Sequence, residues 1–266
     1  PHTKAYDQHL LGQLINSTIE DVSHKEKVGY DAVVGMLNRW GKTEVNWNEI
    51  AQLDILGIDE ISLKKGHKDF VTIVSGRHND RLHILAVLPD RKKETVKAFL
   101  VTIPRSVREQ LTSVCCDLNE GFMNAAKEVF GDTVLVADRF HVAQLYRKSV
   151  ETLRKQELKR LKQTLPKDEY GKLKGVMWSL RKAPPELTAE DTERLTCLFT
   201  HSPQLKAAHG FCQELTDLFD SHIGKETAEQ KITVWIRRVQ ESGLTCFKTF
   251  LTTLDKWRNE ISNYFH

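Results

Sequence analysis

The sequence lacks the features of a secreted or membrane-inserted protein. No apolar run approaches the roughly 20 residues that cross a bilayer, and no basic segment followed by an apolar one stands near its start. Cysteines are few, irregularly spaced and without a CxxC pair, which excludes a disulfide framework and argues against a zinc site. They are Cys115, Cys116, Cys197, Cys212 and Cys246. We expect a globular protein of a reducing cytoplasm, without a membrane partner.

The chain as a whole has little excess charge, but one segment is strongly basic. The net charge of all 266 residues is +3, whereas residues 142–182 hold 12 Lys and Arg against 4 Asp and Glu, a local excess of +8. A basic helical segment of this kind predicts a surface for phosphate backbones, although a solvated helix face is an equal interpretation. The predicted contacts are Arg147, Lys148, Arg154, Lys155, Lys159 and Arg160.

Residues 1–50 carry the pattern of a small helical domain. Thr18 is placed to cap a helix, and Gly29 allows a tight turn before a second short helix over about residues 30–40. This outline predicts a helix-turn-helix, whose second helix offers Asn38 and Arg39 to DNA. A plain helical hairpin that packs on the next domain remains the alternative.

From residue 54 the apolar pattern changes from a helical to a strand period. Three strands in a meander, followed by strands that alternate with helices, predict a mixed five-stranded sheet covered by helices, an α/β fold. The predicted strands are residues 53–61, 69–76, 81–89, 111–117 and 133–138, and the predicted helices between them are residues 94–104 and 119–130.

Everything after the fifth strand is predicted to be helical. A long basic amphipathic helix leads into segments interrupted by prolines, and a last helix spans about residues 244–264. We therefore expect a catalytic core over residues 54–145, a long all-α insertion over residues 146–243, and a C-terminal helix over residues 244–266 that returns to the core.

Aspartates mark the ends of three predicted strands. Asp59, Asp117 and Asp138 stand at or near the carboxyl ends of the first, fourth and fifth strands, the edge where α/β sheets bind ligands. Gathered carboxylates repel one another unless a cation lies among them, and oxygen ligands suit Mg²⁺ or Mn²⁺. Glu60 follows Asp59 directly, so it points to the opposite face of the strand.

Four stretches resemble a known family. "GIDEISLKKGHKDFVTIV", "CCDLNEGFMNAAKEVF", "VADRFHV" and "EISNYFH" are similar, in this order, to segments of the DDE transposases of bacterial insertion sequences, within the group called ISL-three. The resemblance spans residues 55–266 and implies a ribonuclease-H-like catalytic domain, preceded by the helix-turn-helix.

The resemblance also implies roles for individual residues. Asp59 and Asp117 match the first two catalytic acids, which hold two divalent ions during DNA cleavage and strand transfer. Asp138, Arg139 and His141 match a motif diagnostic of the family. The residues themselves predict instead that Asp138 caps the helix beginning near Phe140, while His141 packs or hydrogen-bonds locally. Further along the first hairpin, Lys64, Lys65 and His67 would lie near substrate phosphate or form an ordinary polar turn.

Two parts of the family pattern are not found in the sequence. The third acid, a glutamate, is expected beyond His266, and the family's cysteine-containing zinc module is also missing, so we expect a fragment whose set of catalytic acids is incomplete. Glu260 is the remaining internal candidate for the third acid.

The expected function is transposition at the bacterial nucleoid, by a homo-oligomer on terminal inverted repeats and target DNA. A non-catalytic DNA-binding protein and a resolvase-like nuclease are the alternatives.

Overall fold

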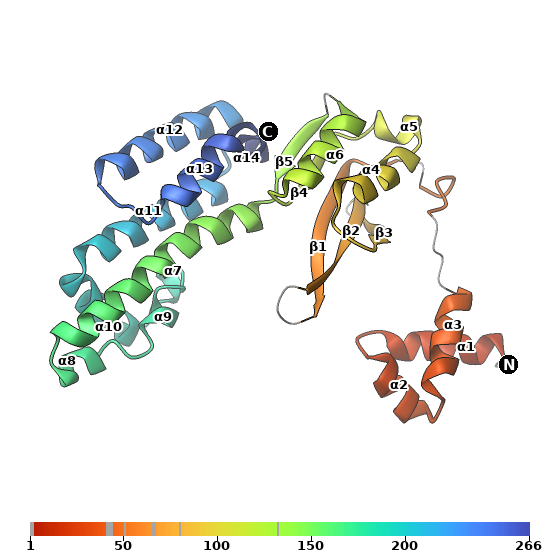
Figure 1. The fold of residues 1–266 in the computed structure, drawn as a ribbon, viewed down its shortest axis with the longest axis horizontal. Helices are drawn as coiled ribbons and strands as arrows, with labels where there is room; N and C mark the ends of the chain where they lie inside the picture. Colours follow the sequence, from red (N-terminus) through yellow and green to blue (C-terminus); the bar gives the residue numbers. More distant parts are fainter. Residues whose placement is uncertain (1–2, 41–44, 51, 65–67, 80, 132) are drawn as a thin grey trace. The chain divides into compact units, whose positions relative to one another are not determined.

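The chain folds into two compact units in the computed structural model, Pro1–Glu49 and Ile50–His266. The structure describes residues 3–40, 45–50, 52–64, 68–79, 81–131 and 133–266, drawn as a ribbon in Figure 1. In these ranges no helix combines the length and the apolar character needed to cross a membrane.

Three helices form the first unit around a small apolar core. They are α1 (Lys4–Leu14), α2 (Ile19–Glu26) and α3 (Tyr30–Trp40), with Leu10, Val22, Val33 and Met36 buried between them. The Thr18 hydroxyl caps α2 by accepting a hydrogen bond from the Asp21 backbone N–H at 3.1 Å. The left-handed residue of the following turn is Lys27 (φ 54°) rather than Gly29. Gly29 instead supplies the carbonyl that accepts the Val33 N–H and starts α3.

A mixed five-stranded sheet organises the second unit, as the sequence predicts. Its strands are β1 (Ile55–Lys64), β2 (Lys68–His78), β3 (Arg81–Leu88), β4 (Ser113–Cys116) and β5 (Val134–Ala137). Their order is β3-β2-β1-β4-β5, with an antiparallel meander on one side of the sheet and β1, β4 and β5 parallel on the other. The predicted α/β fold class is therefore confirmed.

The β1–β2 hairpin extends beyond the parallel half of the sheet. The last aligned pair of β1 and β4 is Ile58 and Cys116, whereas β1 stays paired with β2 up to Lys64 and Lys68. Asp59 therefore lies in the middle of its strand, not at its carboxyl end as the sequence pattern suggested. The short length of β4 is what places Asp59 at the edge of the parallel strands.

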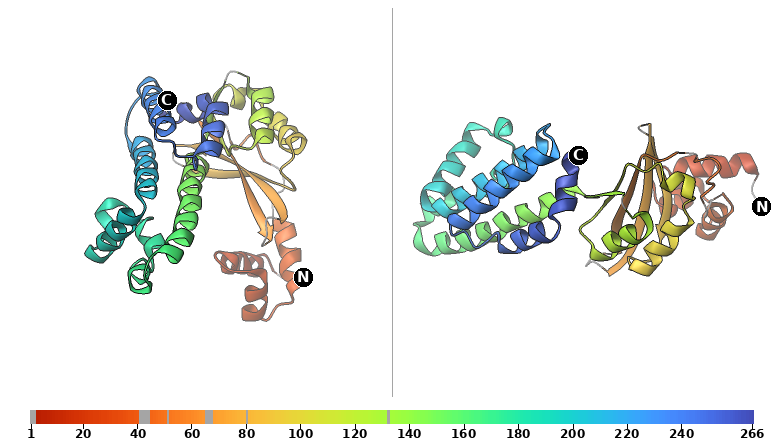
Figure 2. Two further views of the ribbon diagram at one scale, coloured as in Figure 1. Left: turned by 60° about the vertical axis from the view of Figure 1, so that its left-hand side comes forward. Right: turned by 90° about the horizontal axis from the view of Figure 1, so that it is seen from above.

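The two faces of the sheet are covered differently. Over one face lie α4 (Lys93–Thr102) and α6 (Glu120–Phe130), as Figure 2 shows. The Cys116 thiol contacts the Met123 sulfur of α6 at 3.3 Å. The strand side chains of the opposite face are exposed on β3. These are Leu82, Ile84 and Val87, each at least 60% exposed. Asp59 projects from this exposed face, because it pairs with Ile73 and Ile73 pairs with Val87.

Helices make up the rest of the second unit. The short helix α5 (Arg105–Arg108) precedes β4. The helices that follow β5 are α7 (Arg139–Thr164), α8 (Lys167–Gly171), α9 (Val176–Ser179), the 3₁₀ helix η1 (Pro184–Glu186), α10 (Ala189–His201), α11 (Pro203–Asp220) and α12 (Lys225–Glu241). Aromatic rings pack these helices together. Trp235 meets Phe247 edge-on with ring centroids 5.5 Å apart, and its indole N–H donates to the Phe211 carbonyl at 3.0 Å.

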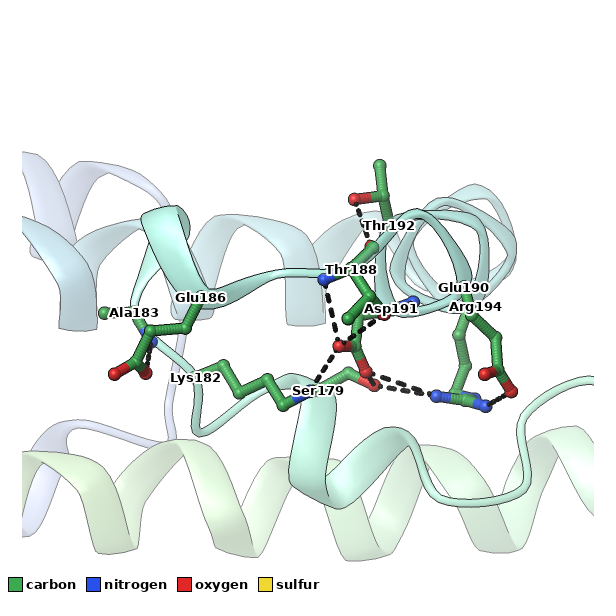
Figure 3. A network of polar contacts seen from close by, with 9 residues as sticks. All are labelled: Ser179, Lys182, Ala183, Glu186, Thr188, Glu190, Asp191, Thr192 and Arg194. Carbon is green, nitrogen blue, oxygen red and sulfur yellow. Dashed lines mark hydrogen bonds and ion pairs between the residues drawn. The ribbon is translucent and has the colours of Figure 1, made fainter.

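A buried carboxylate joins α9 to α10, as Figure 3 shows. Asp191 accepts hydrogen bonds from the Lys182 ammonium at 2.5 Å, the Ser179 hydroxyl at 2.7 Å and the Thr188 backbone N–H at 3.2 Å. These donors, with Lys182 foremost, hold the pKa of Asp191 well below its ordinary value. The carboxylate therefore stays ionised and fixes the turn between the two helices.

The C-terminal segment returns to the sheet as two short helices, so the single helix predicted over residues 244–264 is wrong. The helix α13 (Lys248–Lys256) ends at Trp257, whose backbone (φ −113°, ψ 26°) leaves the helical region, and α14 (Arg258–Ser262) and the 3₁₀ helix η2 (Asn263–Phe265) follow. The break turns the chain so that the Asn263 amide donates to the Leu135 carbonyl of β5 at 2.7 Å. An amphipathic pattern does not reveal such a break, because both helices keep apolar residues at helical spacing.

Candidate active site

Two aspartates are neighbours at the edge of the parallel strands. Ile58 lies opposite Cys116, and the next residues are Asp59 and Asp117, the latter donating its N–H to the Ile58 carbonyl at 3.4 Å. The Asp59 side chain is 56% exposed and that of Asp117 is 22% exposed. The pair is therefore open to a large ligand on the side of Asp59 and enclosed on the side of Asp117.

The electrostatic surroundings of Asp117 disfavour its charge. Burial raises the pKa of Asp117, and the carboxylates of Glu60 and Asp59 raise it further, against the opposing effects of His141 and the Leu118 N–H. The ionised form of Asp117 thus lacks full compensation from the protein. A cation beside it would provide the missing compensation.

Asp138 begins the helix that follows the fifth strand. Its carboxylate accepts the Phe140 N–H at 2.7 Å and so caps α7, while its own N–H donates to the Cys116 carbonyl at 2.9 Å. Asp138 therefore fixes the start of α7 at the same sheet edge as Asp117.

His141 lies among the three aspartates, on the first turn of α7. Its Nδ1 is 3.2 Å from Asp117 Oδ1 and 4.0 Å from Asp138 Oδ2, and its Nε2 is 3.9 Å from Asp59 Oδ1. The Nδ1 atom is buried and makes no hydrogen bond of good geometry to the described residues, so its contact with Asp117 is electrostatic, and it is an ion pair when the imidazole is protonated. The motif identified in the sequence thus places a nitrogen base between the candidate metal ligands.

A family model gives this arrangement its context. The model, described as a transposase of the DDE type and the ISL3 (ISL-three) group, matches residues 56–266. The chain belongs to this family. The match confirms the predicted resemblance, and DDE transposases as a family use divalent metal ions.

Two curated relatives agree with the family match. The chain is 24% identical over 280 residues to the transposase of insertion sequence element IS1557 from Mycobacterium tuberculosis, covering 98% of this chain and 62% of the relative. It is 23% identical over 251 residues to the transposase of IS1001 from Bordetella parapertussis, covering 93% and 60%. The chain thus spans about three fifths of the length of these relatives.

The donor set of this ISL3-family site fits a hard divalent cation. The described residues hold no group of three or more His, Cys, Asp and Glu side chains able to bind a metal. Mg²⁺, however, is usually bound through one or two carboxylates, with water and substrate phosphate completing its shell. Asp59 and Asp117 supply these two carboxylates, and the exposure of Asp59 leaves room for a phosphate.

Glu60 lies closer to Asp117 and His141 than the strand pattern predicts. It does point to the opposite face from Asp59, where it accepts two hydrogen bonds from Arg91 at 3.1 and 3.2 Å. Asp117, which lies past the end of β4, lines one cavity of about 570 Å³ together with Glu60, His141 and Trp257. The sequence analysis did not predict the role of Arg91, which binds the Glu60 carboxylate and lies 4.1 Å from the centre of the Phe70 ring. No local motif marks that pairing.

The internal candidate for a third acid is used elsewhere in the fold. Glu260 on α14 is 8% exposed and forms an ion pair with Lys127 of α6 at 2.7 Å. No contact joins it to Asp59, Asp117 or His141 in the part of the chain that the structure describes. Arg139 of the transposase motif also makes contacts within the fold, since it binds Asp220 and the Tyr264 hydroxyl.

The basic residues predicted on the insertion divide into paired and unpaired groups. Arg154 is bound to Glu151 at 2.6 Å and Arg160 to Glu157 at 2.7 Å, and both pairs lie within one turn of α7. Lys155 lies 3.7 Å from Glu151. The others are exposed and form no ion pair with the described residues. They are Arg147, Lys148 and Lys159.

The remaining predicted DNA contacts belong to the first hairpin and to the first unit. Lys65 and His67 fall outside the described residues, as does the side chain of Lys64. In the first unit, Asn38 is exposed on α3, whereas Arg39 donates to the buried Asp7 at 3.1 and 3.2 Å. The Trp40 indole also donates to Asp7, at 2.9 Å. Arg39 thus serves the packing of its own unit.

Proposed function

We propose that this chain carries the catalytic core of an insertion-sequence transposase, which cleaves DNA at terminal inverted repeats and transfers the cut ends to target DNA. The observation that carries the proposal is the pairing of Asp59 and Asp117 at one sheet edge, on either side of His141. The family match supports the same reaction class.

Asp59 and Asp117 are the residues that would hold Mg²⁺ or Mn²⁺, with two ions in the complete enzyme. When bound, such ions lower the pKa of the attacking water or 3′-hydroxyl and stabilise the leaving oxygen. The third acid that the family resemblance implies, beyond His266, stays a prediction.

The other residues of the site have supporting roles in this proposal. Asp59, which is exposed, faces the incoming phosphate, while the more enclosed Asp117 is held by its contact with His141. Asp138 fixes His141 in turn, because it caps the helix on which His141 stands. His141 is therefore a positioning residue, which keeps the two carboxylates in place until a cation and DNA arrive.

DNA contacts outside the site complete the proposal. Arg147 and Lys148, exposed on α7, would bind backbone phosphates and give a salt-dependent affinity. The three-helix unit would bind DNA through α3 as a helix-turn-helix. We further infer that the protein acts as a homo-oligomer, since two DNA ends must be joined, and that it works at the bacterial nucleoid.

The proposal is tested with the full-length transposase and DNA that carries its inverted repeats. Asp59→Asn and Asp117→Asn should each lower the rate of Mn²⁺-dependent cleavage by at least about 10³-fold, because each removes a metal-binding charge. Asp168→Asn, which neutralises an exposed acid on α8, is the matched control and should leave the rate unchanged. Calorimetric titration with Mn²⁺ alone should show weakened binding in the first two variants only.

Two results would point to other functions. DNA binding without any cleavage by the wild-type protein would indicate a non-catalytic DNA-binding protein. Cleavage of branched DNA without joining of ends would indicate a resolvase-like nuclease. Undiminished cleavage by both Asp59→Asn and Asp117→Asn would contradict the assignment of the site.

A further inference from the structure

A second cavity lies in the helical insertion. It has a volume of about 620 Å³ and is enclosed by α7, the segment around α9 and α11. This volume falls in the range of roughly 300–1,000 Å³ that is typical of ligand pockets. Neither Asp59 nor Asp117 lines it, so it is distinct from the candidate active site.

The lining of this insertion pocket combines an apolar wall with cationic side chains. Val150, Met177 and Leu180 supply apolar surface. Two of the lining cations are neutralised, because Arg154 pairs with Glu151 and Lys182 pairs with Asp191. The rest form no ion pair with the residues that the structure describes. These are Arg147, Lys148 and Arg181.

Neutral polar and aromatic groups complete the pocket. His209 lies with Nε2 3.2 Å from the Leu180 carbonyl, so that nitrogen donates and Nδ1 is left as an acceptor. Burial lowers the pKa of His209, which keeps the ring neutral. Trp178 follows Met177 in sequence but is not among the lining residues; it is 62% exposed, with the Arg181 guanidinium 5.5 Å from its ring.

The insertion pocket adjoins the active site along α7. Gln144 lines both this pocket and the cavity that contains Asp117 and His141. Arg147 follows His141 by six residues, about 9 Å along the helix axis, which is the length of roughly three base steps of a DNA strand. A strand bound at the acids therefore has the pocket within reach a few nucleotides away.

We propose that the insertion pocket binds one unstacked nucleotide of the DNA strand that occupies the active site. The inference rests on the proposed function. The apolar wall of Val150, Met177 and Leu180 takes the base, whose stacking energy in the duplex must be replaced, and Arg147, Lys148 and Arg181 take its phosphates. An inorganic anion would leave the apolar wall uncovered, and an apolar ligand would leave the three cations without partners.

Fluorescence anisotropy with a labelled single strand of about twelve nucleotides tests this proposal. A second strand of the same length carries abasic residues at its centre, so that the phosphates are equal and only bases are missing. Wild-type protein should bind the intact strand about tenfold more tightly than the abasic one. Met177→Ala and Leu180→Ala should bring that ratio close to one, and a thermal melt verifies that each variant is folded.

A charge variant separates phosphate binding from base binding. Arg147→Gln with Lys148→Gln should weaken binding of both strands and reduce the salt dependence more than Lys159→Gln with Lys162→Gln does. The control pair removes the same charge from exposed positions of the same helix, outside the pocket. Photocrosslinking of a strand that carries 5-iodouracil should label residues 177–183.

Distinct results overturn distinct parts of the argument. Equal affinity of the wild-type protein for intact and abasic strands would overturn the pocket proposal while leaving the proposed function intact. Full competition by free thymidine monophosphate at the affinity of the strand would reassign the pocket to a free nucleotide. A failure of the wild-type protein to bind any DNA would overturn the proposed function as well.

Discussion

The sheet edge around Asp117 and the α9–α10 junction around Asp191 each enclose a carboxylate, but they surround it with different partners. Asp191 receives donors from Lys182, Ser179 and Thr188, and its pKa is held far below the ordinary value. Asp117 is flanked by two further acids, and its pKa is raised. A structural acid is thus satisfied by the protein itself. The Asp117 carboxylate of the candidate site, in contrast, carries a charge that the protein does not fully neutralise and that an external cation can neutralise.

The largest effect on stability is expected at the satisfied acid. Asp191→Ala leaves the buried Ser179 hydroxyl without its acceptor and Lys182 without its counter-ion. It should lower the Tm by roughly 4–8 °C. Glu190→Gln, at the exposed neighbouring position, is the control and should change the Tm little. An equal loss in both variants would remove the distinction between a buried network and a surface ion pair.

The pH dependence of this effect follows from the lowered pKa. A carboxylate whose folded-state pKa is depressed contributes stability above its unfolded-state pKa, about 4, and loses it as the pH falls below that value. The difference in Tm between wild type and Asp191→Asn should therefore be full at pH 6 and shrink below about pH 4. Calorimetric scans between these limits measure it.

A smaller effect of opposite sign is expected at Asp117. Because its folded-state pKa is raised, the folded protein loses stability relative to an uncharged side chain as the pH rises through the titration range of aspartate. In the presence of a chelator, Asp117→Asn should therefore melt slightly above wild type at pH 7 and level with it at low pH. Saturating Mn²⁺ should stabilise wild type alone and reverse the order. A variant that melts lower with and without metal would show that Asp117 is satisfied after all.

The smallest effect concerns His141. A positive charge on His141 lowers the pKa of Asp117 and so counteracts the rise that burial causes. His141→Gln removes that charge and should raise the pKa of Asp117 further. Titration of the carboxyl carbon by NMR measures the shift. His83→Gln, at an exposed position on β3, should leave the pKa unchanged. An unchanged pKa in His141→Gln would mean that the imidazole carries no charge beside Asp117.

Much of the sheet could be predicted, because each strand is marked by its own local run of apolar residues. The apolar runs ending near Asp117 and Asp138, each followed by a helix, are sufficient to predict parallel strands whose acids meet at one edge. The antiparallel meander that precedes them could also be predicted, from its hairpin turn. The family motifs then assign roles that periodicity alone does not.

The features that sequence reasoning missed all depend on contacts between distant residues. The Glu60–Arg91 pair spans 31 positions, and the Lys127–Glu260 pair spans 133. Neither leaves a mark in a local pattern. The position of Asp59 within β1 was missed because the length of a partner strand, β4, decides where the parallel edge falls. The role of Asp138 as a cap, in contrast, was predicted and is confirmed, since it requires only the residues beside it.

The cap at Asp138 also has a mechanical consequence. One residue is tied to β4 through its N–H and to the start of α7 through its carboxylate. The 26 residues of α7 form a rod of about 39 Å. A tilt of about 5° at that hinge would carry the far end of the rod through about 3 Å. Such a lever arm would convert a shift at the acids, too small to break a hydrogen bond, into a displacement of the distal insertion about as large as one base step.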